Sequence, residues 1–381
     1  MTHDLERAGR SLVAKLCTLA VMLLLCATVV ACGGKGGGGS FNVKMVNSAQ
    51  KKPANVWVFF TVQKGDDPVG GLAAEDFTIY EDGQEVSKFE SKQVILNPEM
   101  AAVMYTMLLV DMSGSVTESG QADSLVDSAK DFSERVGKHQ KVGVYAFDGS
   151  EKLHSVTPFT ESQGSVAGGL EGLRRFKPKD PSTNLHGAVV EGLRELKAAL
   201  DKEKKPLKFG TLVVFSDGTD RANRVTRQDM EKEIDEEAYE HYEMYAIGVG
   251  AEIEKAHLED IGRDGTELAT DQAKVREAFD KVAGKIEAHM KRFYLLSYCT
   301  PSRKGDHEVR IEAHKKGENG GSGSVEYKFN SDGFGPPPEC DPNTPPAFDM
   351  KATPADGEGK DRDGDKPAKG GKVEVKAGDK K

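Results

Sequence analysis

The sequence predicts an α/β domain with a doubly wound, mainly parallel sheet, inserted in or flanked by a small β-sandwich domain. Between residues 101 and 290, apolar runs of strand length alternate with amphipathic helical patterns. Near-continuous apolar strands separated by helices are typical of parallel sheets that are covered on both faces. Outside that region the pattern is strand after strand. The 381 residues indicate two folded units and two tails, since a domain takes roughly 150 residues.

The expected α/β region runs from residue 101 to residue 290. Strands are expected at 103–110, 141–147, 210–216 and 243–249, and helices at 122–136, 166–176, 185–200, 227–239 and 271–289. In an open sheet of this kind, ligands bind beyond the carboxyl ends of the strands. The loops that follow the strands are therefore where a site is expected.

Two β-rich segments, residues 41–100 and 291–334, flank the α/β region. The first has runs of β-branched and aromatic residues and an Asp82-Gly83 turn that is typical of a hairpin. The second alternates apolar and polar residues, as half-buried strands do. Because three or four strands form a thin module alone, we expect the two segments to pack together. A separate C-terminal hairpin module is the alternative.

Both ends of the chain have the composition of tails. Residues 335–381 are rich in proline and then in Asp, Lys and Gly, which predicts a disordered tail. At the amino terminus, basic residues precede an apolar core, residues 16–30, which is too short to be read as a membrane-spanning helix. This pattern is typical of an export signal.

The end of the export signal resembles the lipobox of bacterial lipoproteins. The residues are Val29-Val30-Ala31-Cys32-Gly33. The resemblance implies that residues 1–31 are removed, that Cys32 carries acyl chains, and that residues 32–40 form a glycine-rich tether; Gly33 in place of Asp favours the outer membrane in the Gram-negative pattern. Acyl chains bind membranes with about 0.8 kcal/mol per buried methylene. The alternatives are a plain secretory signal and an uncleaved anchor.

The cysteines fall into groups. Cys17 and Cys26 lie within the expected signal peptide, and Cys32 is the lipidation site. Cys299 and Cys340 remain as an even pair in an export context, where disulfides persist, so we expect a bond between them. The alternative is two unpaired thiols.

Oxygen-bearing side chains gather after three of the expected strand ends and loops. Asp111, Ser113 and Ser115 directly follow an apolar strand, Thr183 precedes a helix, and Asp217 follows another strand. Carboxylates and hydroxyls are hard donors that suit Mg²⁺, Ca²⁺ or Mn²⁺. These residues therefore predict a divalent-cation site.

Local roles are the alternative for each of these residues. Asp111, Ser113, Ser115 and Thr183 could cap helices, and Asp217 could serve only the turn before a glycine. Three further acids near the same edge of the sheet are expected to be solvated rather than to support the site: Glu118, Asp148 and Asp220.

Residues 103–290, which contain these candidate ligands, resemble a von Willebrand factor type A (vWA) domain, whose doubly wound sheet is Rossmann-like. Asp111-Met112-Ser113-Gly114-Ser115 matches the Asp-x-Ser-x-Ser sequence of its metal-ion-dependent adhesion site (MIDAS), and Thr183 and Asp217 match its threonine and second aspartate. Residues 72–89 also resemble the β segment that precedes this domain in a set of exported bacterial proteins.

The resemblance implies a cation held by the three hydroxyls, with the two aspartates bonded directly or through water. Neutral hydroxyls leave positive character on the metal, so that an acidic group of a protein partner can complete its coordination. Mg²⁺ is expected first, because it prefers six oxygens and keeps exchangeable waters. Ca²⁺ and Mn²⁺ are the alternatives.

The predicted function is protein binding by a membrane-anchored, extracytoplasmic module of the cell envelope. A net charge of −10 argues against nucleic acid, and no small-molecule cofactor motif is complete. A Mg²⁺-dependent phosphoryl enzyme is one rival, but Ser113 occupies the position where a haloacid-dehalogenase phosphatase needs an aspartate, and no general base pairs with a nucleophile. A structural subunit with an idle metal site is the other rival.

Overall fold

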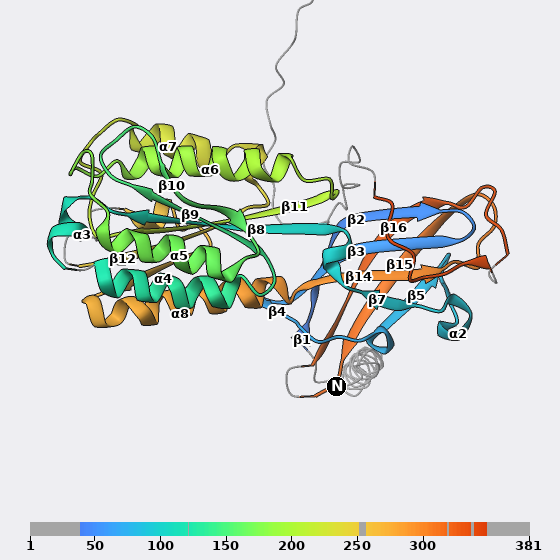
Figure 1. Cartoon of the computed structure of the whole chain (residues 1–381). Helices are drawn as coiled ribbons and strands as arrows, with labels where there is room; N and C mark the ends of the chain where they lie inside the picture. The colour runs from blue at the N-terminus through green and yellow to red at the C-terminus, as the bar shows by residue number, and fades with distance from the viewer. Residues whose placement is uncertain (1–38, 121, 251–256, 318–319, 337–338, 349–381) are drawn as a thin grey trace, which may run out of the picture.

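The computed structural model describes residues 39–120, 122–250, 257–317, 320–336 and 339–348. It has an α/β half and an all-β half, joined end to end (Figure 1). The expected signal peptide and Cys32 lie outside the described residues, as does the tail after residue 348. Within the described residues, no helix is both long enough and apolar enough to cross a membrane.

The α/β half is built on one six-stranded sheet in the order β10-β9-β8-β11-β12-β13. The strands are β8 (Ala102–Asp111), β9 (Lys141–Phe147), β10 (His154–Thr160), β11 (Leu207–Ser216), β12 (Glu243–Val249) and β13 (Gly265–Ala269). All neighbours are parallel except β10, which runs antiparallel to β9. The predicted mainly parallel α/β sheet is confirmed, and its central strand β8 is the one that ends in the candidate site.

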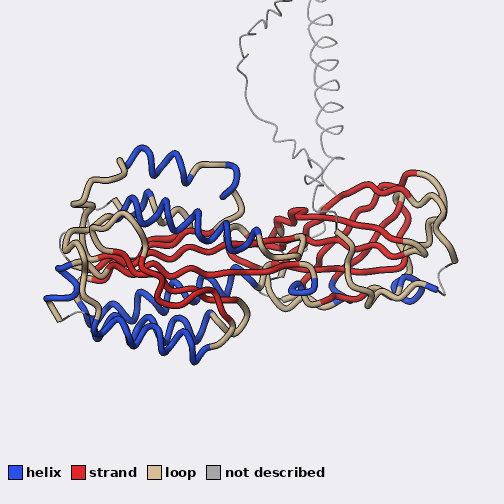
Figure 2. Tube along the Cα trace, turned by 45° about the horizontal axis from the view of Figure 1, so that its top comes forward, coloured by secondary structure: helices blue, strands red, loops and turns tan. Residues whose placement is uncertain are grey.

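Helices cover both faces of this sheet, as Figure 2 shows. One core cluster joins β8 and β9 to α4 (Ala122–Val136), α5 (Gln163–Gly172) and α8 (Gln272–Met290). The other joins the opposite face to α6 (Leu185–Asp201) and α7 (Arg227–Ile234). Because helices cover both faces of each central strand, side chains on both faces are buried. The central strands are therefore continuous apolar runs in the sequence.

Two edge strands of the α/β sheet were not expected. Strand β10 contains Pro158, and its pairing with β9 is broken by register shifts. Proline lacks the N–H that a central strand needs, so it is tolerated at an edge. Strand β13 is only half-buried, with Leu268 exposed. Neither strand has the continuous apolar pattern on which the prediction depended.

The all-β half is a sandwich of two antiparallel sheets built from both flanking segments. One sheet has the order β1-β16-β15-β5-β6 and the other β2-β3-β14-β7, with β4 beside β3. The strands are β1 (Gly39–Ser40), β2 (Asn42–Lys51), β3 (Asn55–Lys64), β4 (Asp67–Pro68), β5 (Phe77–Glu81), β6 (Gln84–Glu85), β7 (Val94–Leu96), β14 (Phe293–Cys299), β15 (Asp306–Lys315) and β16 (Gly321–Asn330), with the short helix α2 (Lys88–Ser91).

Pairing between strands that are distant in sequence closes the sandwich around the inserted domain. Strand β14 pairs with β3, and β15 pairs with β5. Strand β1, at the end of the expected tether, pairs with β16. The α/β domain is thus inserted between the two parts of one sandwich rather than followed by a separate hairpin module.

The two halves share an apolar junction where β8 and β11 meet the sandwich. Phe293 lies between Phe59, at a ring-centroid distance of 5.6 Å, and Phe209, at 4.8 Å. Trp57 and Met104 belong to the same buried cluster. Since strand β8 is continuous from this junction to its far end, the junction and the candidate site lie at opposite ends of one rigid element (Figure 1).

The prediction of a disordered tail from Gly335 is wrong for residues 339–348. Cys340 is bonded to Cys299 by a disulfide. The amide of Asn55 donates to the carbonyl of Asp341 at 2.6 Å, and the indole N–H of Trp57 donates to the carbonyl of Thr344 at 3.0 Å. Phe348, only 8% exposed, packs into the junction cluster. The proline-rich composition gave no sign of these contacts, because they are made by backbone carbonyls and by one aromatic ring.

Candidate metal centre

The candidate centre is formed where β8 and the neighbouring parallel strand β11 end. Their register places Phe215 beside Val110, so Asp111 and Ser216 emerge at the same edge of the sheet. Ser216 Oγ donates to Asp111 Oδ2 at 2.7 Å, and the Ser113 N–H donates to Asp111 Oδ1 at 3.0 Å. Both oxygens of the Asp111 carboxylate are therefore held in place, and that side chain is completely buried.

A chain of side-chain oxygens leads from this carboxylate toward solvent. Ser113 Oγ and Ser115 Oγ are hydrogen-bonded at 3.1 Å, and Ser115 Oγ donates to Asp217 Oδ1 at 2.9 Å. Adjacent ligands around an octahedral ion with metal–oxygen distances of about 2.1 Å lie about 3.0 Å apart. The spacing of these oxygens thus fits adjacent ligand positions around a small divalent cation.

Thr183 is brought to the same place by backbone hydrogen bonds from both other loops. Its carbonyl accepts from the N–H groups of Arg221 at 2.9 Å and Ala222 at 3.0 Å. The Gly114 N–H donates to the carbonyl of Pro181 at 2.9 Å, and a Cβ at position 114 would approach Pro181 to 3.1 Å. The side chain of Thr183 is buried. All three loops that carry predicted ligands therefore converge.

Helix capping does not account for the two residues that precede helices. Ser113 is the N-cap of α3 (Gly114–Glu118), yet its side chain makes no cap hydrogen bond. Asn184, not Thr183, is the N-cap of α6, and it too makes no side-chain cap bond. The Ser113 hydroxyl instead faces Ser115. These serine and threonine hydroxyls are thus not consumed by the local roles that were the main alternative.

The electrostatics of the site favour a bound cation. The pKa of Asp111 is raised to about 6, chiefly by burial and also by the nearby Asp217, against the hydrogen bonds from Ser216 and Ser113 that lower it. A divalent cation would offset both unfavourable contributions, because it supplies positive charge next to a desolvated carboxylate. The donor set therefore fits the group that the sequence implied.

Two acids near the site are not solvated, contrary to expectation. Asp148 is completely buried and accepts hydrogen bonds from the N–H groups of Ser150 and Lys179, both at 2.7 Å. Asp220 has a side chain that is 5% exposed and accepts from the His186 N–H at 2.8 Å. Only Glu118 is exposed as expected. Asp148 and Asp220 are buried because both carboxylates accept hydrogen bonds from backbone groups that are distant in sequence.

Sequence reasoning also gave no role to Ser216. Its hydroxyl joins Asp111 to the Gly218 turn, since the Gly218 N–H donates to Ser216 Oγ at 3.3 Å. The only signal was its position directly before Asp217 at the end of an apolar strand. The register between β8 and β11 places this hydroxyl beside the end of the neighbouring strand. Amino-acid composition does not reveal that register.

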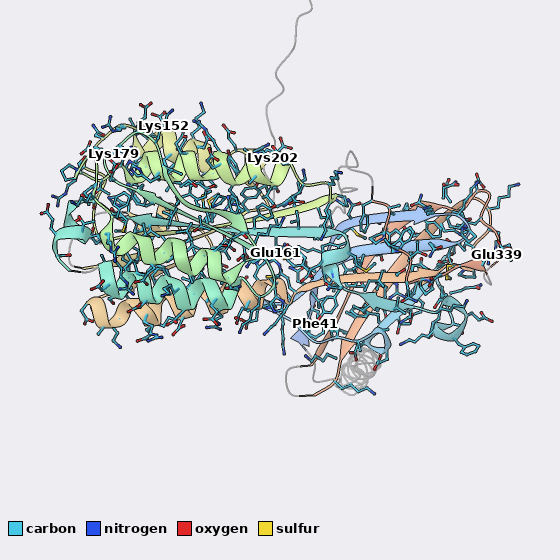
Figure 3. The ribbon with its side chains drawn as sticks, in the orientation of Figure 1. Phe41, Lys152, Glu161, Lys179, Lys202 and Glu339 are labelled. Atoms are coloured by element: carbon cyan, nitrogen blue, oxygen red, sulfur yellow. A yellow bond between two sulfur atoms is a disulfide. The ribbon has the colours of Figure 1, made fainter. Side chains whose placement is uncertain are left out.

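The site lies at the end of the α/β domain that faces away from the sandwich. Figure 3 shows Lys179, from the loop that carries Thr183, at that end, whereas Glu339 lies at the far side of the sandwich. Helix α3, which follows Ser113, lies at the same extremity in Figure 1. A partner could therefore approach the site without meeting the all-β half.

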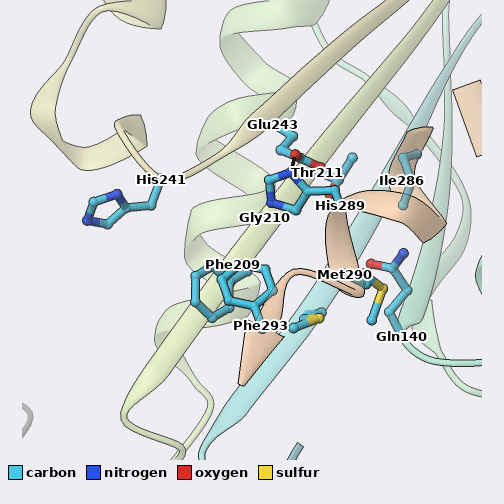
Figure 4. A pocket seen from close by; sticks show the side chains of 11 residues that line it. Gln140, Phe209, Gly210, Thr211, His241, Glu243, Ile286, His289, Met290 and Phe293 are labelled. Carbon is cyan, nitrogen blue, oxygen red and sulfur yellow. Dashed lines mark ion pairs between the residues drawn. The ribbon is translucent and has the colours of Figure 1, made fainter. Parts of the chain in front are cut away.

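Two cavities lie away from the site, at the junction of the two halves. Figure 4 shows a small pocket in which His289 faces Glu243 while His241 points away. Its volume is about 20 Å³, which is room for a water molecule only. An open cleft of about 840 Å³ adjoins it, lined by residues of the sandwich and of α8. Among the described residues, no group of three His, Cys, Asp or Glu side chains is arranged to hold a metal.

Comparison with known protein families agrees with the α/β fold of this half. Residues 106–219 match the sequence profile of the von Willebrand factor type A domain, a span that includes all five predicted metal ligands. A search of curated proteins found no match to the chain.

Solved structures resemble the chain at low similarity. Proximal thread matrix protein 1 from the mussel byssus, with a zinc-occupied MIDAS motif, is 16% identical with a TM-score of 0.41, and the match covers 48% of each chain. The vWF domain of the type V pili tip protein Mfa5 from Porphyromonas gingivalis is 12% identical with a TM-score of 0.40, covering 50% of this chain and 97% of that one. The von Willebrand factor type A protein from Catenulispora acidiphila is 12% identical with a TM-score of 0.39, covering 79% and 76%. The chain thus spans about half the length of the mussel protein.

Proposed function

We propose that this protein is a membrane-anchored, extracytoplasmic binding protein that recognises a protein partner through a divalent cation. The observation that carries the proposal is the chain of hydrogen bonds from Asp111 through the Ser113 N–H, and from the Ser113 hydroxyl through Ser115 to Asp217. It lies at the exposed end of a vWA domain, beside the buried Thr183. Cys32 and the glycine-rich tether would hold the domain at the membrane surface.

The donor set determines what the bound ion would do. Two hydroxyls and the threonine contribute no formal charge, so the ion would keep positive character and attract a carboxylate of the partner. Mg²⁺ is the preferred ion, since it takes six oxygen ligands and keeps exchangeable waters that a carboxylate of the partner can replace.

An enzymatic role has less support from the site. Phosphoryl or hydrolytic chemistry needs a positioned nucleophile or base in addition to the metal. The Asp111 carboxylate is completely buried and accepts from Ser216 and from a backbone N–H, so its remaining lone pairs are available to the metal rather than to a substrate. Ser113 and Ser115 are bonded to each other and to an acid rather than to a histidine or lysine.

The experiment is a pull-down of envelope proteins with the purified, tethered chain in the presence of Mg²⁺. Capture of a specific partner should be lost on chelation and in Ser113→Ala, with an unchanged circular dichroism spectrum. Ser119→Ala is the matched control, because this hydroxyl lies just beyond α3 and donates to the carbonyl of Val116, within the same helix. Equal capture by the wild type, Ser113→Ala and chelated samples would refute cation-dependent binding and leave the structural role.

A further inference from the structure

Asp148 lies at the end of β9, in a loop that none of the predicted ligands occupies. Its Oδ1 accepts from the Ser150 N–H at 2.7 Å, which turns its own loop. Its Oδ2 accepts from the N–H groups of Lys179 at 2.7 Å and Asp180 at 3.4 Å. The second oxygen therefore reaches across to the loop of residues 176–184, which carries Thr183.

Backbone hydrogen bonds extend this connection on both sides. The Asn184 N–H donates to the carbonyl of Asp148 at 3.0 Å, and the Gly149 N–H donates to the carbonyl of Asp180 at 3.0 Å. The Asn184 amide also donates to the carbonyl of Ser150 at 2.9 Å. The Thr183 loop has no regular secondary structure of its own, so its place is determined by these contacts together with the backbone hydrogen bonds from Gly114, Arg221 and Ala222.

The Asp148 carboxylate is completely buried, and burying a charged group is unfavourable in free energy unless hydrogen bonds compensate for the lost solvation. Burial alone would raise the pKa of Asp148, but the hydrogen bonds from Ser150 and from the Lys179 N–H lower it below its ordinary value. His154 Nε2 lies 3.3 Å from Asp148 Oδ2 on the remaining side. The side chain is therefore a charged acceptor that backbone donors surround, rather than a ligand directed at the centre.

We propose that Asp148 is a positioning residue of the metal centre, which holds the Thr183 loop so that the threonine hydroxyl faces the oxygens of Asp111, Ser115 and Asp217. The inference rests on the proposed cation site and adds a residue outside its ligand set. Asp220, on the other side, is bonded in a similar way to backbone groups, since its carboxylate accepts from the His186 and Asn223 N–H groups at 2.8 and 2.7 Å.

The variant that tests the inference is Asp148→Asn, which preserves shape. The asparagine side chain has one carbonyl oxygen, which can replace only one of the two carboxylate oxygens that accept hydrogen bonds in the wild type. Its NH₂ group would therefore face the N–H of either Ser150 or Lys179. Mg²⁺ binding to the purified chain, measured by titration calorimetry, should weaken about 10-fold, the effect expected when a support of a metal ligand is lost. In metal-free protein, amide hydrogen exchange of a peptide spanning residues 176–184 should become faster while α4 and α8 keep their rates.

Two comparisons separate positioning from other effects. Glu118→Gln removes an exposed charge near the centre without a buried hydrogen bond, so it should leave Mg²⁺ affinity nearly unchanged. In a Thr183→Ala background, Asp148→Asn should cost little further affinity, because the two changes act through one ligand.

The outcomes are distinguishable. If Asp148→Asn binds Mg²⁺ like the wild type, or weakens binding equally with and without the Thr183 hydroxyl, the positioning role is refuted while the cation site stands. The same holds if exchange accelerates uniformly across the domain. A wild-type chain that binds no Mg²⁺ would refute the cation site and the positioning role together.

Discussion

Ser216 donates its hydroxyl hydrogen bond to Asp111 across the ends of two neighbouring parallel strands, with Oγ 2.7 Å from Oδ2. Both side chains are completely buried. A carboxylate that is desolvated in this way keeps one orientation only while its acceptor positions are filled. The contact therefore links β11, which leads to Asp217, to β8, which leads to the two serines.

Replacing Ser216 tests this link. Ser216→Ala should keep the fold but weaken Mg²⁺ binding about 10-fold, because the carboxylate loses the donor that orients it. Ser128→Ala is a suitable control, since this buried serine lies in α4 and its hydroxyl donates to the carbonyl of Ser124. Titration calorimetry with Mg²⁺ measures both variants. Unchanged affinity in Ser216→Ala would show that the Ser113 N–H alone orients Asp111.

The sequence alone predicted the parts of this site that lie on the strand ends. An apolar run that stops at Asp111 and a second that stops at Ser216 place their following residues at one edge, because parallel strands align their carboxyl ends. The buried roles of Asp148 and Asp220 could not be predicted in this way. Their partners are backbone N–H groups about 30 residues away in sequence, and such contacts leave no periodic or compositional signal.

Some strands could be predicted from the sequence and others could not. Central strands such as β8 and β12 are apolar on both faces and were predicted within one or two residues. The edge strand β10 was missed, because its proline and register shifts hide strand character. The packed segment at 339–348 was missed although the disulfide of Cys340 was expected, because its other contacts are made by backbone carbonyls and by one aromatic residue, Phe348.

Phe348 should contribute strongly to stability although it lies near the end of the described chain. It is 8% exposed in a cluster with Trp57 and Phe293, so Phe348→Ala should lower the free energy of unfolding by about 3 kcal/mol. Phe89, which is 91% exposed, is the matched control, and Phe89→Ala should change stability by less than about 0.5 kcal/mol. Urea unfolding measures both. Equal effects would show that the 339–348 segment does not pack on the junction.

The disulfide should stabilise the sandwich through the chain it closes. Cys299 and Cys340 are separated by 41 residues, and a loop of that length reduces the entropy of the unfolded chain by the equivalent of about 4 kcal/mol. The double variant Cys299→Ser, Cys340→Ser should therefore unfold at lower urea concentration by a corresponding amount. Reduced wild-type protein should match the variant. A variant as stable as the oxidised protein would contradict this contribution.

The last prediction concerns pH and the His289 side chain at the junction. Arg292 can only donate, so its contact with His289 Nε2 at 2.6 Å requires that nitrogen to be unprotonated. Nδ1 then carries the proton and faces Glu243, which makes that contact a hydrogen bond from a neutral ring. Burial, with repulsion from Arg292, lowers the pKa of His289 to about 3. The folded protein therefore holds this histidine neutral at any pH near neutrality.

In the unfolded chain, His289 titrates near its ordinary pKa of about 6.5. Between about pH 6.5 and 3 the unfolded state thus binds more protons than the folded state, and stability falls as the pH falls, by up to about 1.4 kcal/mol per pH unit. His289→Gln keeps a neutral donor and acceptor, so its stability should decline less between pH 7 and pH 5 than that of the wild type. The exposed His241, changed to Gln, is the control. Urea midpoints across this pH range decide the matter, and parallel profiles for the wild type and His289→Gln would show that His289 is protonated in the folded protein.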